Sequence, residues 1–76
     1  MGKKTSFVID GARLTSARIE AGFSMDELAT RLKFNKSNLS RWEREINRPN
    51  DSSMLQLAVA LGRVDFIKEI GGENGK

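Results

Sequence analysis

The sequence contains no cysteine, no histidine and no tyrosine. These absences exclude disulfides, thiol chemistry and zinc sites built on cysteine and histidine, and they remove the side chain that most often acts as a general base. With 76 residues, the chain also has little room for a deep substrate pocket. We therefore expect a protein that is not an enzyme and that binds no metal and no cofactor.

Long apolar runs are missing as well. The longest are a few residues, far short of a membrane span, and the first residues, MGKKTSFVIDG, lack the apolar stretch of a signal peptide. The absence of cysteine fits a reducing compartment. We expect a cytoplasmic protein with no membrane partner.

The chain is near the lower size limit for a core that is stable without disulfides or metals. We expect a single domain over residues 1–76, with mobile ends at about 1–6 and 71–76, where Gly, Lys and Ser are frequent. The apolar, β-prone residues 7–9 have no visible partner strand. They are predicted to form an extended arm that packs on the core.

Apolar residues recur with the spacing i, i+3, i+4, i+7, which is typical of amphipathic helices. Asp10, Ser24, Asn35 and Asn50 precede these segments and are suited to cap them. Gly22 is a plausible left-handed terminator of the first helix. The segment VDFIKEI suggests a short fifth helix. The predicted fold class is all-α, a compact bundle of five short helices at about 11–21, 25–32, 36–44, 51–61 and 64–70.

Positive charge is concentrated in one part of the chain. The net charge is +3, but residues 31–48 contain six basic and two acidic side chains, a net of +4, and the remainder has a net of −1. Such a concentration is expected of a surface that binds a polyanion. A solvated face without a partner is the alternative, and composition alone does not decide between the two.

The segment FNKSNLSRWER, residues 34–44, shows how a helix here would be oriented. At about 100° per residue, Leu39 and Trp42 fall on one side, which we predict to be buried in the core. The opposite side would then be polar and basic, and free for binding. It consists of Lys36, Ser37, Ser40, Arg41 and Arg44.

Only about three residues, 33–35, separate this helix from the preceding one, which predicts a helix-turn-helix whose second helix enters the major groove of DNA. Lysine and arginine donate to guanine O6 and N7, and serine bonds to several base edges. We expect base contacts from Lys36, Ser37 and Arg41. Contacts to the DNA backbone or flanking bases are expected from Ser24, Lys33, Asn35, Asn38, Ser40, Arg44 and Arg48.

From about Ala12 to Gly62 the sequence resembles the Cro/C1-type (XRE-like) helix-turn-helix regulators with the lambda-repressor-like fold. The resemblance rests on AR at 17–18, Gly22, Ser24, ELA at 27–29, LSRWE at 39–43, Pro49 and LAVALG at 57–62. It implies base contacts at Lys36, Ser37 and Arg41. It also implies a structural ion pair between Arg18, on the inward side of the first helix, and Glu43. The alternative is two ordinary surface charges.

Three residues depart from the family pattern. Met25 stands where the family favours a glutamine that often contacts a phosphate. Lys33 replaces the usual turn glycine and is predicted to adopt left-handed geometry at a cost of about 1 kcal/mol. Glu45 replaces a common glycine, and nothing in the sequence explains a negative charge at this place.

These features predict a sequence-specific, double-stranded-DNA-binding transcriptional regulator, a dimeric repressor that inserts residues 36–44 in the major groove. The alternative is an antitoxin-type or controller protein whose main role is to bind a partner protein, with autoregulatory DNA binding. Some apolar residues lie off the inward side of the fourth helix or in the last segment. They either form a homodimer or partner surface or cover one another within a monomer: Leu55, Val59, Phe66, Ile67 and Ile70.

Overall fold

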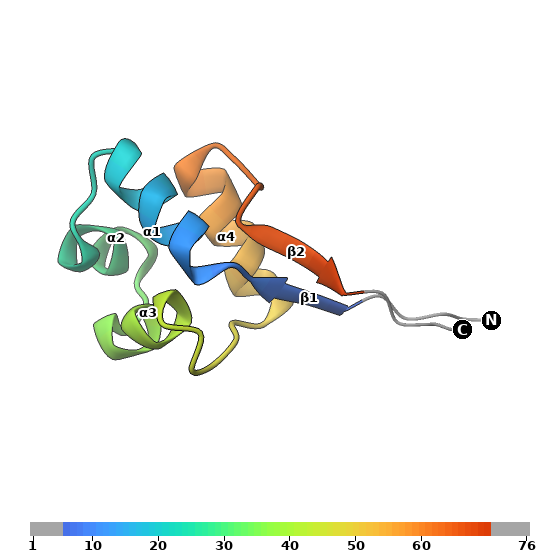
Figure 1. Ribbon diagram of the computed structural model, residues 1–76. Helices are drawn as coiled ribbons and strands as arrows, with labels where there is room; N and C mark the ends of the chain where they lie inside the picture. The colour runs from blue at the N-terminus through green and yellow to red at the C-terminus, as the bar shows by residue number, and fades with distance from the viewer. Residues whose placement is uncertain (1–5, 71–76) are drawn as a thin grey trace, which may run out of the picture.

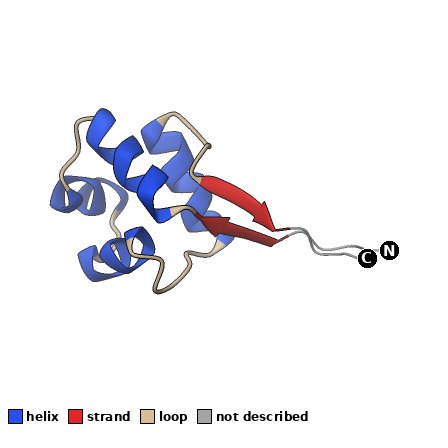
Figure 2. Ribbon diagram, viewed as in Figure 1, coloured by secondary structure: helices blue, strands red, loops and turns tan. Residues whose placement is uncertain are grey.

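The computed structural model describes residues 6–70 of the chain. Four helices pack around one core, and a two-stranded sheet lies beside them (Figures 1 and 2). The ends expected to be mobile lie outside the described residues, except for Ser6, which begins the first strand. In chain order the elements are β1 (Ser6–Ile9), α1 (Gly11–Glu20), α2 (Met25–Leu32), α3 (Lys36–Glu43), α4 (Asp51–Leu61) and β2 (Ile67–Ile70).

The four helices begin where their capping residues predict. Side-chain oxygens of Asp10, Ser24, Asn35 and Asn50 each accept a hydrogen bond from a backbone N–H in the first turn, which satisfies donors that have no partner within the helix. At α2 the capping box is complete. Gly22 follows α1 with a φ of 86°, as expected of a left-handed terminator. The predicted ends at residues 21 and 44 are each one residue too long.

The predicted fifth helix is wrong. Its last residues form β2, which pairs antiparallel with β1, and Ser6 lies opposite Ile70. The pairing continues where the Asp10 N–H donates to the carbonyl oxygen of Phe66 at 2.7 Å. The fold is therefore mostly helical with a small sheet rather than all-α, and residues 7–9 are a paired strand rather than an isolated arm.

The physical reason lies in the short length of the segment and in the strand with which it pairs. A seven-residue segment gains too few hydrogen bonds to offset helix nucleation, and its β-branched residues suit a strand. The partner strand lies about sixty residues earlier in the chain, so no local pattern could indicate the pairing. Once the two segments meet, each satisfies the other's backbone groups.

The core draws one fully buried leucine from every helix. These are Leu14, Leu28, Leu39 and Leu57, and Phe66, just before β2, is equally inaccessible. Burying each such side chain contributes about 1.5–3 kcal/mol. Trp42 is 7% exposed and packs edge to face on the ring of Phe34, with the two ring centroids 5.2 Å apart. The tryptophan is therefore a core residue, as its position in the sequence predicts.

The N-terminus of α1 lies directly against the end of α3. A Cβ at Gly11 would overlap the backbone carbonyl of Glu43, so only glycine fits here. The Gly11 N–H donates to Oε2 of Glu45 at 2.7 Å. Since the first N–H groups of a helix have no partner within it, this contact explains the glutamate that the sequence left unexplained.

At its other end α1 is connected to the segment between α4 and β2 through Arg63. This guanidinium pairs with Glu20 of α1 and with Asp65. The hydrogen bond from Arg63 lowers the pKa of Asp65 below its ordinary value. The resulting stabilisation is present above the ordinary aspartate pKa of about 4 and is lost as the pH falls through the lowered value.

Candidate nucleic-acid interface

The turn between α2 and α3 is short and sharp. Lys33 ends α2 with φ 61° and ψ 36°, the predicted left-handed geometry. The Phe34 N–H then donates back to the Ala29 carbonyl at 2.8 Å, which satisfies a terminal carbonyl of α2. Asn35 caps α3 two residues after Lys33. This turn makes α2 and α3 a helix-turn-helix.

Helix α3 has a buried side and an open side. Leu39 is fully inaccessible and Trp42 nearly so, whereas Lys36, Ser37 and Arg41 are all exposed. The apolar side chains hold the helix against the core. None of the three residues predicted to contact bases is covered by a neighbouring helix.

A shallow hollow lies between the start of α2 and α3. It brings together the three predicted base-contacting residues and two of the predicted backbone contacts. Met25, where the family favours glutamine, also faces it, so its apolar side chain lies beside the polar groups of α3. The lining residues are Met25, Lys36, Ser37, Ser40, Arg41 and Arg44.

The basic side chains of α3 have few protein partners. Arg44 makes a long hydrogen bond to the Ser40 carbonyl at 3.4 Å, and Arg41 makes one to Asn38 at 3.5 Å. Bonds at these distances are weak. Lys36 is different, because its Nζ lies 3.1 Å from Oδ1 of Asp26 in α2. Asp26 was not among the predicted site residues, since the sequence spacing does not bring it to α3.

The remaining predicted DNA contacts lie around α3. A second hollow beside the turn and the α3–α4 connection includes Lys33, Asn35, Asn38 and Arg48. The Asn35 oxygen accepts from the Ser37 N–H as a cap, which leaves its amide donors free. Ser24 lies apart from both hollows at the start of α2, where its oxygen caps the helix while its O–H can still donate.

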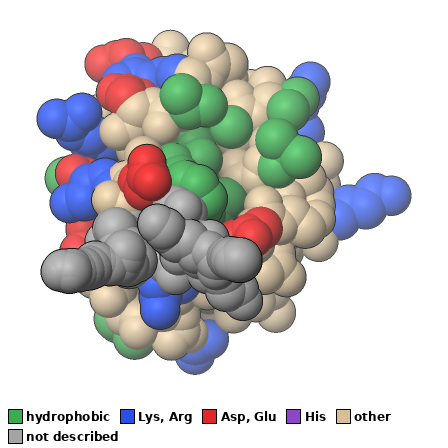
Figure 3. All heavy atoms as spheres, turned by 90° about the vertical axis from the view of Figure 1, so that its right-hand side faces the viewer, with side chains coloured by type: hydrophobic (Ala, Val, Ile, Leu, Met, Phe, Trp, Pro, Cys, Tyr) green, Lys and Arg blue, Asp and Glu red, His purple; other side chains and the backbone are tan. Residues whose placement is uncertain are grey.

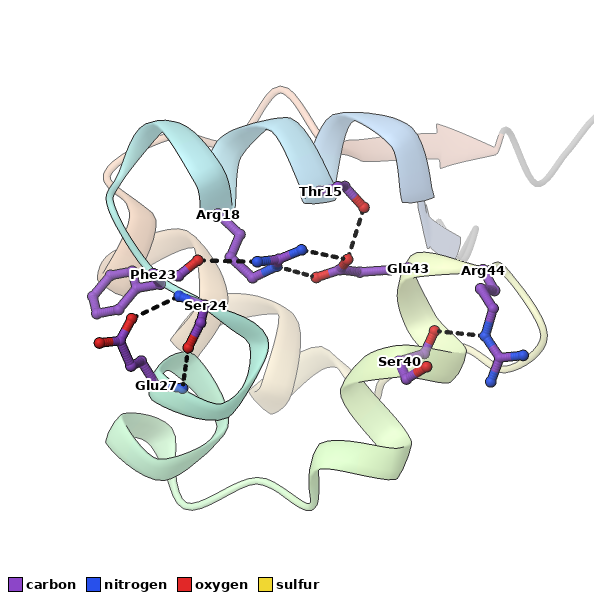
Figure 4. Close-up of polar contacts among 8 residues, drawn as sticks. All are labelled: Thr15, Arg18, Phe23, Ser24, Glu27, Ser40, Glu43 and Arg44. Atoms are coloured by element: carbon purple, nitrogen blue, oxygen red, sulfur yellow. Dashed lines mark hydrogen bonds and ion pairs between the residues drawn. The ribbon is translucent and has the colours of Figure 1, made fainter.

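The end of α3 is tied to α1 by a nearly buried ion pair (Figure 4). Arg18 Nε donates to Glu43 Oε2 at 2.7 Å, Nη2 donates to Oε1 at 3.2 Å, and Nη1 donates to the Phe23 carbonyl. Thr15 adds a third donor to the carboxylate at 2.8 Å. The two charged side chains are only 12% and 6% exposed. Bidentate geometry of this kind fixes orientation, so the pair holds α3 relative to α1.

Only some of the residues predicted to form a dimer or partner surface are exposed. Leu55 and Val59 are 64% and 75% exposed on α4. Phe66 is a core residue and cannot form such a surface, and the side chain of Ile70 lies outside the described part of the structure. Ile67 is half-buried. We define the apolar surface as Phe7, Leu55, Val59, Val64 and Ile67.

The apolar surface contains a hollow between α4 and the sheet, to which Phe7, Leu55, Val64 and Ile67 contribute. Hydrophobic side chains gather on the face of the molecule that Figure 3 shows. Exposed apolar area of this kind is typical of surfaces that bind another protein chain.

None of the helices within residues 6–70 has both the length and the apolar character needed to cross a membrane. Over the same residues, the side chains of histidine, cysteine, aspartate and glutamate form no group of three or more that is suited to a metal ion.

Comparison with known proteins gives two findings. The model of the family HTH_3, described as helix-turn-helix, matches residues 14–67. The chain is also 38% identical over 48 residues to a protein of Bacillus subtilis (strain 168), the HTH-type transcriptional regulator ImmR. That alignment covers 63% of this chain but only 38% of the relative, so the chain spans little more than a third of the relative's length.

Proposed function

Since the chain belongs to the Cro/C1-type (XRE-like) helix-turn-helix family, we propose that it is a transcriptional regulator that binds double-stranded DNA in a sequence-specific manner. The observation that carries the proposal is the open, basic side of α3, with Leu39 and Trp42 holding the other side in the core. The proposed role is binding and involves no catalytic step.

In the proposed complex, the N-terminal part of α3 enters the major groove. Lys36 and Arg41 donate to guanine O6 and N7, and Ser37 bonds to a neighbouring base edge. The exposure of these three residues and their common hollow support this assignment. The ion pair of Glu43 supports it further, because base recognition requires a helix with a fixed orientation.

Contacts to phosphates set the position of α3 along the duplex. We assign this role to residues in α3, in the segments on either side of it and at the start of α2, all of which carry hydrogen-bond donors. They are Ser24, Lys33, Asn35, Asn38, Ser40, Arg44 and Arg48. Among them, the cationic residues Lys33, Arg44 and Arg48 neutralise phosphates and release counterions, so these three contribute to the salt dependence of the affinity.

We further propose that the protein acts as a dimeric repressor. One short helix contacts only a few base pairs, whereas two copies can bind half-sites about 34 Å apart on one side of the duplex. The apolar surface supports an interface between copies, because Leu55 and Val59 are mostly exposed in a single chain.

The test is a titration of the protein against short duplexes of different sequence at several salt concentrations. We expect the logarithm of the affinity to fall with the logarithm of salt, with a slope of about −0.9 for each neutralised phosphate. A subset of duplexes should bind more tightly at every salt concentration. Equal affinity for all duplexes would contradict sequence-specific regulation.

The apolar surface also favours a second candidate, an antitoxin-type or controller protein whose main partner is another protein. Such a protein would use the apolar surface for that partner and α3 for autoregulatory DNA binding. The two candidates differ in self-association. A chain that stays monomeric at high concentration, and also when bound to DNA, would favour the second.

A further inference from the structure

The ion pair between Asp26 and Lys36 lies at the edge of the proposed DNA-binding surface. Asp26 is in the first turn of α2 and Lys36 is the first residue of α3, and their side chains meet across the turn at 3.1 Å. Both side chains are exposed, at 72% and 58%. A carboxylate beside a surface proposed to bind phosphates repels them, so its presence there calls for a reason.

The chemistry of lysine provides one. An ammonium group has three N–H donors on a flexible four-carbon chain, and it loses much rotational freedom when it is fixed in one place. The ion pair with Asp26 restricts that chain, while N–H donors of the ammonium group can still face away from the carboxylate. Guanine offers two acceptors in the major groove, O6 and N7. A lysine held beside Asp26 can therefore donate to guanine without leaving its partner.

We infer that Asp26 is a positioning residue that acts through Lys36 and sets the base preference of α3. This inference rests on the proposed function. The Asp26 carboxylate then has two effects. It repels phosphates and so lowers affinity for DNA of any sequence. It also raises discrimination between bases at the base pair that Lys36 contacts.

A purely structural role for Asp26 is a poor account of the pair. The start of α2 is capped by Ser24 and Glu27, which bond to each other's backbone N–H groups without Asp26. Exposed ion pairs contribute little to stability. The variant Asp26→Asn keeps the side-chain shape and is expected to fold normally, so its DNA binding can be compared directly with that of the parent.

The experiment uses synthetic duplexes with a randomised central segment, from which the parent protein selects preferred sequences. Dissociation constants are then measured for the preferred duplex and each of its single-base-pair variants. The proteins compared are the parent, Asp26→Asn, Lys36→Ala and the double variant. Glu20→Gln is the matched control, because it removes a carboxylate from another ion pair, whose partner Arg63 lies between α4 and β2 rather than on α3. Figure 1 shows the ends of the helices concerned.

We expect Asp26→Asn to raise affinity for non-preferred duplexes about two- to threefold at low salt, since one negative charge near the phosphates is removed. At one base pair its discrimination should fall about threefold or more, part of the roughly five- to 150-fold that a bidentate contact provides. Lys36→Ala should lose discrimination at the same base pair. In the double variant, the asparagine should add no further loss.

Two results would overturn the inference. One is an Asp26→Asn variant whose affinities for all duplexes change by the same factor, which would reduce Asp26 to a repelling charge. The other is a loss of discrimination that persists when Asp26→Asn is added to Lys36→Ala. If the parent itself shows no preference among duplexes, the proposed function fails, and this inference fails with it.

Discussion

At the scale of single residues, Glu43 joins α3 to α1. Its carboxylate accepts from Arg18 and Thr15 and is only 6% exposed. A charge this inaccessible to water is tolerated only while it is paired and hydrogen-bonded. The same bonds join α1 to α3, so stability and the orientation of the proposed DNA-contacting helix depend on one group.

We expect Glu43→Ala to lower the free energy of unfolding by roughly 3–5 kcal/mol, because it leaves the Arg18 guanidinium nearly buried and unpaired. Urea denaturation measures the change. Glu20→Gln, which breaks an exposed pair with Arg63, should change stability by less than about 1 kcal/mol. If the free energy of unfolding of Glu43→Ala lay within about 0.5 kcal/mol of the parent value, a stabilising role of the ion pair would be contradicted.

At the scale of elements, the turn between α2 and α3 combines strain with charge. Lys33 has a positive φ that costs a side-chained residue about 1 kcal/mol, yet it is placed beside α3 with an exposed ammonium. Glycine would adopt the same geometry without strain. The lysine is thus expected to favour binding at the expense of stability.

Lys33→Gly should therefore have opposite effects on folding and on binding. We expect the free energy of unfolding to rise by up to about 1 kcal/mol as the left-handed strain is relieved. Affinity for DNA should fall for every sequence alike, since a phosphate contact is lost. Denaturation and DNA titration on the same preparation measure both. Loss of stability together with unchanged affinity would contradict the assignment of Lys33.

A further prediction for α3 and the loop after it distinguishes residues that contact bases from residues that contact phosphates. Lys36→Ala and Arg41→Ala should mainly relax sequence preference, each by about 1–3 kcal/mol at one base pair. Arg48→Ala, in the loop after α3, should weaken binding to all sequences and reduce the salt slope by about 1. Titrations on a preferred duplex and its single-base-pair variants distinguish the two classes. Equal losses on every sequence for all three variants would show that α3 is wrongly assigned.

At the scale of the whole molecule, the proposed DNA-contacting side chains of α3 and the apolar surface belong to different elements. The basic residues proposed to contact bases are on α3, whereas the apolar surface lies on α4, on the sheet and on the segment between α4 and β2, which Figure 1 places beside one another. Figure 3 shows hydrophobic side chains gathered on that face of the molecule. This separation allows two copies to associate through α4 and the sheet while each keeps α3 open to DNA. Dimer formation and base contact can then be changed by different substitutions.

In the proposed dimer, Val59→Glu should shift the equilibrium toward monomer, because it places a charge in the apolar surface. Sedimentation over a range of protein concentrations measures the shift, and affinity for a two-half-site duplex should fall with it. Ile19→Glu is the control, since Ile19 is also exposed, at 61%, but lies on α1 outside the apolar surface. Unchanged self-association in Val59→Glu would contradict a role of α4 in the proposed interface.

The sequence by itself determined the four helices, their caps and the division of α3 into an apolar and a basic side. All of these depend on residues within about one or two helical turns of one another, so spacing and side-chain chemistry suffice to predict them. The left-handed turn at Lys33 and the ion pair of Arg18 with Glu43 were indicated only by the resemblance to a family.

Only the tertiary structure decided the remaining features. The pairing of β1 with β2 turned an expected helix into a strand and placed Phe66 in the core, away from the apolar surface. Glu45 became a partner for the start of α1, and Asp26 a partner for Lys36. Each of these contacts joins segments whose distance is set by the packing of other elements, and local sequence patterns contain no information about such distances.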